Sequence, residues 1–450
     1  MNVADASTSA ILRVSVRGRR VLLLQGPVGT FFGDLRHALA EAGAQVEHVL
    51  FNAADALFAK RRRRVRDTVT YKGSEEGWSD FLRERIAARN IEAVVLFGCE
   101  RDRHAVARAV CAEHGLPVLS LEEGYVRPGY VTAEWGGNNR RSPLADASME
   151  ALREAARGPV PSGLDGNAFS RMAATSTLYY ILRAAGASAF PQAVHHRDRP
   201  LHFEAVAWLR SGMRKVSHAS TNRRTIDTLL EHHRDEYVLV ALQVSDDMQL
   251  VKAGRGWTTR ALVGEGIASF AAHAPSHRRL VFKIHPLQRG HSQIGTTIRE
   301  LARSHGVENR VDVIDDGSIG LLARSACAML TINSTSAFSA MAVGVPVGVL
   351  GDAMFRRPDT ALCLDDGPTL DAFWTASDAF DTRGARTLRA AMVRTALLPG
   401  DFYLPHLRTA TVQSVIAKLA EGLDEPSPAG PRDHREAVDM PKTRGSKGSL

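Results

Sequence analysis

Short apolar runs alternate along this chain with longer segments in which apolar positions recur at helical spacing. Such runs, bounded by turn residues, are typical of strands buried on both faces, and the amphipathic segments between them are typical of crossover helices. The runs that predict strands are 20–24, 45–51, 93–97, 117–120, 237–242, 279–284, 311–314, 328–332 and 345–350. The pattern therefore predicts an α/β chain with two parallel sheets.

The stretch from about 145 to 235 has no strand pattern and predicts helices between the two sheets. We expect a GT-B-like fold: two Rossmann-like parallel-sheet domains facing a central cleft, a helical connection, and C-terminal helices that pack back on the first domain. The polar, glycine-rich stretch 130–139 is expected to be a loop. The expected parts are a flexible N-terminus (1–19), a first Rossmann-like domain with a helical segment (20–190), a second Rossmann-like domain (191–380), C-terminal helices (381–422) and a disordered tail (423–450).

The composition, 44% hydrophobic and 24% charged over 450 residues, is that of a soluble globular protein. No apolar run approaches the roughly 20 residues that span a bilayer, and no secretory signal pattern is present, so we expect a cytoplasmic protein. The cysteines lack metal-ligand spacing and are expected to be buried thiols of a reducing compartment. They are Cys99, Cys111, Cys327 and Cys363.

A net charge of +8 indicates an anionic partner. Nucleic acid is disfavoured, because only 6% of the residues are aromatic and no nucleic-acid-binding motif is found. The basic run 60–66, KRRRRVR, is either a solvated loop or a contact with an anionic membrane or acceptor. In the second case each basic residue contributes about 1 kcal/mol.

Three predicted strands of the second sheet end in polar residues that are expected to meet at one sheet edge. Polar groups buried there without partners would cost about 1–3 kcal/mol each, so packing alone does not explain them. The triplet Asn333, Ser334 and Thr335 is suited either to cap a helix or to bind a phosphate at the helix start. The other two strand ends present Asp246 with Asp247, and His285 with Pro286.

The first sheet has its own candidates. The turn after the first strand contains Gly26 and Gly29 but lacks the GxGxxG pattern of a dinucleotide site, so it is either a tight turn or a cleft wall. Glu122 and Glu123 follow the strand at 117–120, where a parallel sheet binds ligands. The pair His195 and His196, followed by Arg197, is either part of a surface loop or a binding element.

Together these motifs resemble the capsule polysaccharide biosynthesis and export proteins of the KpsS/LipB type, from about residue 20 to 360. One departure is Ser245-Asp246-Asp247-Met248-Gln249, where the family leads us to expect a sequence close to His-Asn-Asp-Ser-Gln. The motifs are, in order, Leu24-Gln25-Gly26-Pro27 with Phe31-Phe32, Phe51-Asn52-Ala53-Ala54-Asp55, Glu122-Glu123-Gly124-Tyr125-Val126-Arg127-Pro128, His195-His196-Arg197, Leu242-Gln243-Val244, Asp247, Lys283-Ile284-His285-Pro286 and Asn333-Ser334-Thr335.

The resemblance implies a retaining β-Kdo transferase that moves Kdo from CMP-Kdo to a lyso-phosphatidylglycerol-type lipid and so starts the capsule linker. The first domain would then be the acceptor side and the second would bind the CMP-sugar. No cofactor and no metal are implied, because CMP leaves with less charge than a nucleoside diphosphate. The implied partners are the CMP-sugar donor, the anionic lipid acceptor, the cytoplasmic face of the inner membrane and other capsule-assembly proteins.

Residue roles follow from the same resemblance. Asp247 is the expected nucleophile with Asp246 as its alternative, and Glu123 or Glu122 is the expected base. Arg127 pairs either with the Kdo carboxylate or with a carboxylate of the protein itself. The residues expected at the CMP phosphate are Lys283, His285, Pro286, Asn333, Ser334 and Thr335. The residues expected at the sugar or the acceptor are Gln25, Gly26, Arg127, His196, Arg197 and Gln243.

Two other functions remain open at this point. One is a non-catalytic capsule assembly or export factor that binds lipid-linked polysaccharide. The other is a transferase that uses a different nucleotide sugar.

Overall fold

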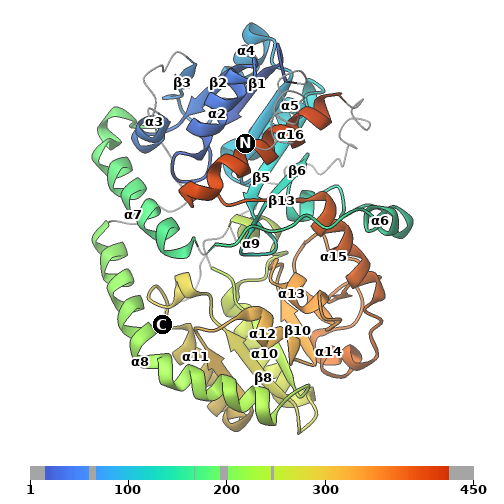
Figure 1. Cartoon of the computed structure of the whole chain (residues 1–450). Helices are drawn as coiled ribbons and strands as arrows, with labels where there is room; N and C mark the ends of the chain where they lie inside the picture. The colour runs from blue at the N-terminus through green and yellow to red at the C-terminus, as the bar shows by residue number, and fades with distance from the viewer. Residues whose placement is uncertain (1–15, 60–66, 167, 193–200, 245–247, 425–450) are drawn as a thin grey trace.

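The computed structural model describes residues 16–59, 67–166, 168–192, 201–244 and 248–424. The chain forms two α/β lobes, one above the other in Figure 1. The first lobe is built on a seven-stranded sheet and the second on a six-stranded sheet. This confirms the α/β class and the two parallel-stranded units predicted from the apolar pattern.

The first sheet has the order β13-β6-β5-β4-β1-β2-β3. The five strands from β3 to β5 are parallel, whereas β6 pairs antiparallel with β5, and β13 antiparallel with β6. Strand order reverses between β1 and β4, which makes this the switch point of the sheet. The strands are β1 Arg20–Leu24, β2 Gln45–Leu50, β3 Thr68–Thr70, β4 Ala93–Phe97, β5 Val118–Glu123, β6 Tyr130–Trp135 and β13 Leu397–Pro399.

The second sheet is parallel throughout, in the order β12-β11-β10-β7-β8-β9. Its switch point lies between β7 and β10, and β8 is the other neighbour of β7. The ends of β10, β7 and β8 therefore lie side by side at one sheet edge, as predicted. The strands are β7 Tyr237–Ala241, β8 Arg279–Lys283, β9 Val311–Ile314, β10 Ala328–Thr331, β11 Val347–Val349 and β12 Leu362–Cys363.

Helices cover both sheets, and several end where the sequence places glycine. Gly43 and Gly115, just after α2 and α5, have φ angles of 91° and 65°, which glycine adopts without strain. The helices are α2 Phe31–Glu41, α3 Ala53–Ala59, α4 Trp78–Arg89, α5 Asp102–Glu113, α6 Met149–Ala155, α7 Phe169–Ala185, α8 Leu201–His232, α9 Met248–Ala253, α10 Thr259–His273, α11 Ile294–Ser304, α12 Ile319–Arg324, α13 Ala337–Met341, α14 Leu370–Ala376, α15 Arg383–Thr395 and α16 Pro405–Asp424.

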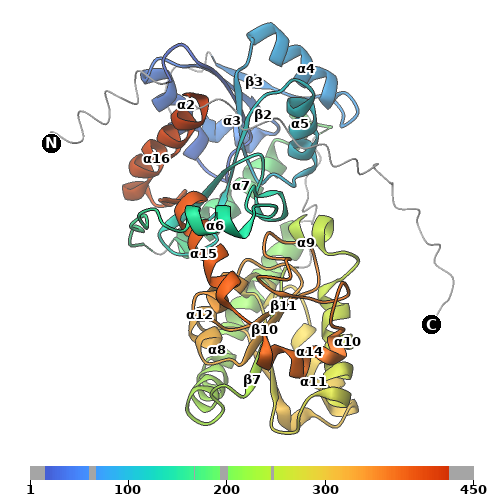
Figure 2. The ribbon, with the colours of Figure 1, turned by 90° about the vertical axis from the view of Figure 1, so that its right-hand side faces the viewer.

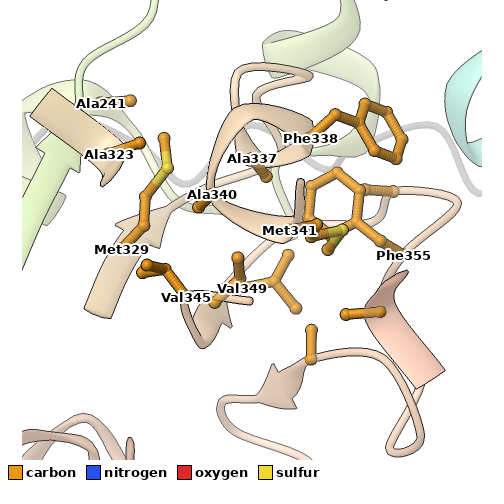
Figure 3. Close-up of a cluster of buried hydrophobic side chains, with 14 of the residues drawn as sticks. Ala241, Ala323, Met329, Ala337, Phe338, Ala340, Met341, Val345, Val349 and Phe355 are labelled. Carbon is orange, nitrogen blue, oxygen red and sulfur yellow. The ribbon is translucent and has the colours of Figure 1, made fainter. Parts of the chain in front are cut away.

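The core of the second lobe closes tightly around β10 and α13 (Figure 3). Ala337 and Ala340 are completely buried, and their small side chains let α13 approach the strands. Phe338 and Phe355 pack edge-to-face, with 5.5 Å between ring centroids. This packing anchors the segment that follows β10.

The hydrophobic core is continuous between the lobes. Tyr125, Leu144 and Leu152 of the first lobe belong to the same buried cluster as Phe338 and Leu388 of the second. In Figure 2, α15 and α16 lead back from the second lobe to the first. There the ring of Phe402 packs against the rings of Phe31 and Phe97, with 4.8 Å and 5.3 Å between the ring centroids. Two Rossmann-like lobes with C-terminal helices that return to the first are the layout of the GT-B fold.

Two expectations about local structure are wrong. The stretch 130–139 is not a loop, because Tyr130–Trp135 forms strand β6 with four consecutive buried residues. The polar residues of this stretch led to the loop prediction. Thr132 and Glu134 are nevertheless buried in the strand, because their side chains are hydrogen-bonded. The C-terminal segment is not entirely helical either, because Leu397–Pro399 adds strand β13 to the edge formed by β6.

Other expectations from composition can be compared directly with the structure. The four cysteines are free thiols, and Cys99, Cys111 and Cys363 are buried as predicted, whereas Cys327 is only partly buried. Among the described helices, none is sufficiently long and apolar to cross a membrane. The domain boundaries stay a prediction.

Candidate functional site

The switch point of the second sheet is occupied by a pair of buried amides. Gln243, just after β7, donates from Nε2 to Oδ1 of Asn333, just after β10, at 2.8 Å. Its Oε1 accepts from the backbone N–H of Asn333 at 3.1 Å. The Nδ2 of Asn333 donates in turn to the carbonyl oxygen of Gln249 at 2.9 Å. These bonds fix the start of α9 relative to the end of β10.

Ser334 and Thr335 lie beside this pair and are partly exposed. The Oγ of Ser334 accepts from the backbone N–H of Ser336 at 3.3 Å. The expectation that Asn333, Ser334 and Thr335 cap the following helix is wrong, since α13 begins only at Ala337 and Ser336 is its N-cap residue. Asn333 is instead drawn towards Gln243. The Ser334 and Thr335 hydroxyls remain at the sheet edge, close to the switch point.

Lys283 ends β8, where its backbone carbonyl accepts from the N–H of Leu242 at 3.0 Å. Lys283 is only 6% exposed. Burial lowers the pKa of Lys283 to about 8, and the carboxylates of Asp316 and Asp315 oppose that shift. At neutral pH the ammonium group therefore carries its charge in a site with little water, where it attracts an anion strongly.

His285 and Pro286 begin a short 3₁₀ helix, Pro286–Gln288. The His285 ring is exposed, and its Nδ1 accepts from the N–H of Leu287 at 3.2 Å. Since Nδ1 is an acceptor, a neutral His285 ring carries its proton on Nε2. Pro286 lacks a backbone N–H and suits the first position of such a turn. His285 is thereby held as an Nε2–H donor at the end of β8.

The end of β9 adds an acidic residue that sequence reasoning did not assign to the site. Asp315 is 6% exposed and is held by Asn222 at 2.6 Å and by the ring of His218 at 2.8 Å. The next residue, Asp316, has a side chain that is 44% exposed, and it lies 3.8 Å from buried Arg289. The two adjacent aspartates were visible in the sequence, but only the structure separates the buried one from the accessible one.

A cavity of about 260 Å³ lies next to these residues. It is bounded by α8, by the turn that contains Gln288 and Arg289, and by the start of α11. Three arginines line it, namely Arg214, Arg289 and Arg299.

The switch point of the first sheet is held by Gln25, which follows β1. Its Nε2 donates to Oδ2 of Asp55 at 3.0 Å, and its Oε1 accepts from Arg101 at 3.4 Å. A side chain at Gly26 would lie 2.5 Å from the ring of Phe32, so glycine is needed there for packing. The turn is thus tight, and the side-chain amide of Gln25 is hydrogen-bonded to other residues of the protein.

Asp55 is the centre of a network to which sequence reasoning assigned no role. Its carboxylate accepts from Asn52 at 2.9 Å and from the hydroxyl of Tyr179 on α7 at 2.9 Å. Burial raises the pKa of Asp55, and hydrogen bonds from Phe51, Tyr179 and Gln25 offset part of the rise. The signal in the sequence is the motif Phe51-Asn52-Ala53-Ala54-Asp55, which carries part of the resemblance. Arg101, whose sequence context carries no such motif, was missed.

Glu122 and Glu123 point to different partners. Glu122 receives a hydrogen bond at 3.5 Å from Nε2 of Gln249 on α9, across the lobe boundary. Glu123 accepts from the hydroxyl of Tyr403 at 2.6 Å and lies 4.0 Å from Arg127. Burial raises the pKa of Glu123, while Arg127 and the Tyr403 hydrogen bond lower it in part. Of the two, Glu122 is therefore the one next to the second lobe.

Arg127 is 57% exposed in its side chain and pairs loosely with Glu123. A second contact between the lobes is made by α9, where Lys252 pairs with Asp102 at 2.8 Å. The structure thus places Glu122, Gln249, Gln243 and Asn333 in one connected set, and places Lys283 on the adjacent strand.

Several predicted site residues lie outside the described residues. These are Asp246, Asp247, His196 and Arg197, together with the basic run 60–66. Among the described residues, no group of three or more histidine, cysteine, aspartate or glutamate side chains is arranged to hold a metal ion.

Comparison with known proteins yields clear relatives. The chain is 30% identical to the capsule polysaccharide export protein KpsS of Escherichia coli, over 76% of this chain and 87% of the relative. It is also 30% identical to the capsule polysaccharide modification protein LipB of Neisseria meningitidis, over 85% and 91%. A solved structure, the β-Kdo 2,7 transferase KpsC of Thermosulfurimonas dismutans, aligns over 90% of this chain and all of that one, with a TM-score of 0.37 and 11% identity.

The family described as "Capsule polysaccharide biosynthesis protein" matches residues 92–403. That range contains the Glu122 strand end, the Gln243–Asn333 pair and Lys283. The chain therefore belongs to the capsule polysaccharide biosynthesis protein family.

Proposed function

We propose that this protein is a retaining β-Kdo transferase that moves Kdo from CMP-Kdo to a lyso-phosphatidylglycerol-type lipid and so starts the linker of a capsular polysaccharide. The observation that carries the proposal is the Gln243–Asn333 pair at the second switch point, with Lys283 and His285 on the neighbouring strand. In open parallel sheets this is where nucleotides bind. Family membership supplies the connection to capsule synthesis.

The CMP phosphate is held by groups that match its charge. The buried ammonium group of Lys283 and the Nε2–H of His285 lie at the end of β8, and the hydroxyls of Ser334 and Thr335 lie just after β10, with β7 between the two strands. Charge-assisted hydrogen bonds of this kind stabilise the leaving phosphate as the glycosidic bond breaks. The proposed mechanism needs no metal, because this cationic edge takes up the developing charge. The cavity next to Gln288 gives the cytidine room.

Retention requires two inversions at the anomeric carbon. In the first, a carboxylate oxygen of Asp247, or of Asp246, bonds to that carbon while the bond to the phosphate oxygen of CMP breaks. In the second, the acceptor hydroxyl oxygen attacks and the carboxylate leaves. The hydroxyl proton passes to a glutamate. We assign that base to Glu122, because it faces α9, whose first residue directly follows Asp247 in the sequence.

The first lobe binds the anionic acceptor and the sugar carboxylate. Arg127 is sufficiently exposed to exchange its loose contact with Glu123 for the Kdo carboxylate. Arg101 adds a second cation at the end of β4, beside Gln25. His196 and Arg197 take part in acceptor binding. The acceptor places the protein at the cytoplasmic face of the inner membrane, together with other capsule-assembly proteins.

The test is a direct assay of transfer. Purified protein is incubated with CMP-Kdo and fluorescent lyso-phosphatidylglycerol, and the product is examined for a mass gain of one Kdo. If the protein transfers no Kdo from CMP-Kdo but transfers a sugar from another CMP-sugar, that CMP-sugar is the donor. A protein that binds no CMP and transfers nothing would instead support a non-catalytic factor that binds lipid-linked polysaccharide. That alternative is favoured by the name of the E. coli relative, an export protein.

A further inference from the structure

Helix α8 has an inverted polarity. Its face towards the second lobe carries small and polar residues: Ala207, Ser211 and Asn222 are at most 7% exposed. At Gly290 a side chain would lie 1.9 Å from the carbonyl oxygen of Ala207, so the helix packs there by backbone contact. Large apolar residues are absent from most of this inner face and occur elsewhere on the helix.

Those apolar residues form a stripe on the opposite face. We call it the α8 stripe, and its members recur every three or four residues, which places them on one side of a helix. Each is more than half exposed, and Val216 is 79% exposed. A stripe of this kind on a monomer marks an interaction surface. Its members are Phe203, Val206, Leu209, Met213 and Val216.

The preceding helix continues the surface. Figure 1 shows α7 and α8 one after the other along the same flank of the molecule. On α7, Leu178 and Ile181 are each 48% exposed. The two helices therefore present exposed apolar side chains beside both lobes.

The charge around the α8 stripe identifies the partner. Helix α7 contains no aspartate or glutamate, and from Leu201 to Ile226 the only acidic residue is Glu204, while the exposed Asp227 and Glu231 follow near the end of α8, beyond the stripe. The exposed basic residues of the same stretch are Arg210, Lys215, Arg223 and Arg224. Apolar side chains flanked by basic ones match an anionic bilayer surface, in which the former enter the acyl boundary and the latter meet phosphates. A second copy of this face would be repelled by like charge.

We propose that the α8 stripe, together with α7, docks this protein on an anionic lipid bilayer in the plane of the membrane interface. The proposal extends the proposed function, on which its purpose rests: a lipid acceptor is reached from a membrane-bound enzyme. It differs from the idea that the basic run 60–66 makes the contact, because it places the contact on described, exposed apolar residues.

The experiment is vesicle flotation with phosphatidylcholine, with and without phosphatidylglycerol. The wild-type chain is expected to float with the anionic vesicles and to be released by high salt. The triple variant Leu209→Ser, Met213→Ser, Val216→Ser is expected to bind about tenfold less. A matched triple variant of exposed apolar residues elsewhere, Val160→Ser, Leu321→Ser and Val343→Ser, is expected to bind like wild type. Circular dichroism verifies that each variant folds.

A charge variant, Arg210→Glu with Lys215→Glu, tests the same surface independently and is expected to lose binding to anionic vesicles. Wild-type levels of binding by either α8 variant would overturn the proposal, as would equal binding of the wild type to neutral vesicles. A change of molar mass in the serine variant without a change in vesicle binding would make the stripe a protein–protein interface and also overturn it. Kdo transfer to a short-chain, water-soluble acceptor is measured in parallel. If the serine variant keeps this activity but no longer binds vesicles, docking alone has failed; if the wild type also shows no transfer, the proposed function has failed.

Discussion

The side-chain amide of Asn139 donates to the backbone carbonyl oxygen of Asn333 at 3.3 Å, and this hydrogen bond joins the first lobe to the switch point of the second. The same side chain accepts from the N–H of Met354 at 3.3 Å. The backbone N–H of Asn139 donates to the hydroxyl of Tyr125. Asn139 is thus bound on both sides, and the relative position of the lobes depends on it.

Replacing Asn139 is expected to weaken this connection. Asn139 has a φ of 52°, so Asn139→Gly removes the amide without straining the backbone. The loss of two buried hydrogen bonds should reduce the free energy of unfolding by about 1–3 kcal/mol, measured by urea denaturation. Asn90→Gly is the matched control, since Asn90 is exposed and has a φ of 46°. Equal effects at the two positions would contradict a role of Asn139 between the lobes.

The affinity for CMP should fall at high pH because of Lys283. Its pKa of about 8 means that the ammonium group loses its charge as the pH rises through that value. Calorimetric titration with CMP should show the dissociation constant rising by up to about tenfold per pH unit above 8. In Lys283→Arg the guanidinium stays charged, so this increase should disappear. Lys252→Met, which changes a lysine at the lobe boundary, should keep the wild-type profile.

The two neighbouring glutamates should differ in their effect on turnover. Glu122→Gln removes the proposed base and should lower kcat by about 100-fold or more, with little change in KM for CMP-Kdo. Glu123→Gln keeps a partner for the Tyr403 hydroxyl and should lower kcat far less. The measurement is the steady-state rate of Kdo transfer. A larger decrease of kcat in the Glu123 variant than in the Glu122 variant would assign the base to Glu123 instead.

Stability should decline between mildly acidic and neutral pH because of Glu134. Burial raises the pKa of this carboxyl to about 7, against hydrogen bonds from Ser142 and Tyr125. Between the unfolded pKa of 4.5 and about 7 the folded state holds a proton that the unfolded state lacks, so the free energy of unfolding falls as the pH rises. The total change is roughly 3 kcal/mol.

Glu134→Gln should abolish that decline when urea unfolding is compared at both ends of this pH range. The exposed Glu265→Gln serves as the control and should retain it. A Glu134 variant with the wild-type slope would show that the decline originates elsewhere.

The strands and the meeting of their ends were predictable because burial on both faces leaves a plain mark in a sequence. Runs such as Ala93–Phe97 and Val311–Ile314 were located to the residue. The carboxyl ends of parallel strands lie at the same edge of a sheet, so the meeting of Gln243, Lys283 and Asn333 at that edge was predictable as well, although the strand order was not. Strand β6 was not predicted, because the burial of Glu134 depends on hydrogen bonds from Ser142 and Tyr125 that no local pattern reveals.

The identity of the chemical groups was thus determined by the sequence alone: the motifs that carry the resemblance, the α/β class and the polar strand ends are local properties. Only the tertiary structure decided which groups face one another. It turned Asn333 away from the helix cap towards Gln243, directed Glu122 to Gln249 and Glu123 to Tyr403, and left the apolar side of α8 exposed. The physical reason is that hydrogen-bond partners and burial depend on residues far apart in the chain, whose contacts exist only once both lobes are packed.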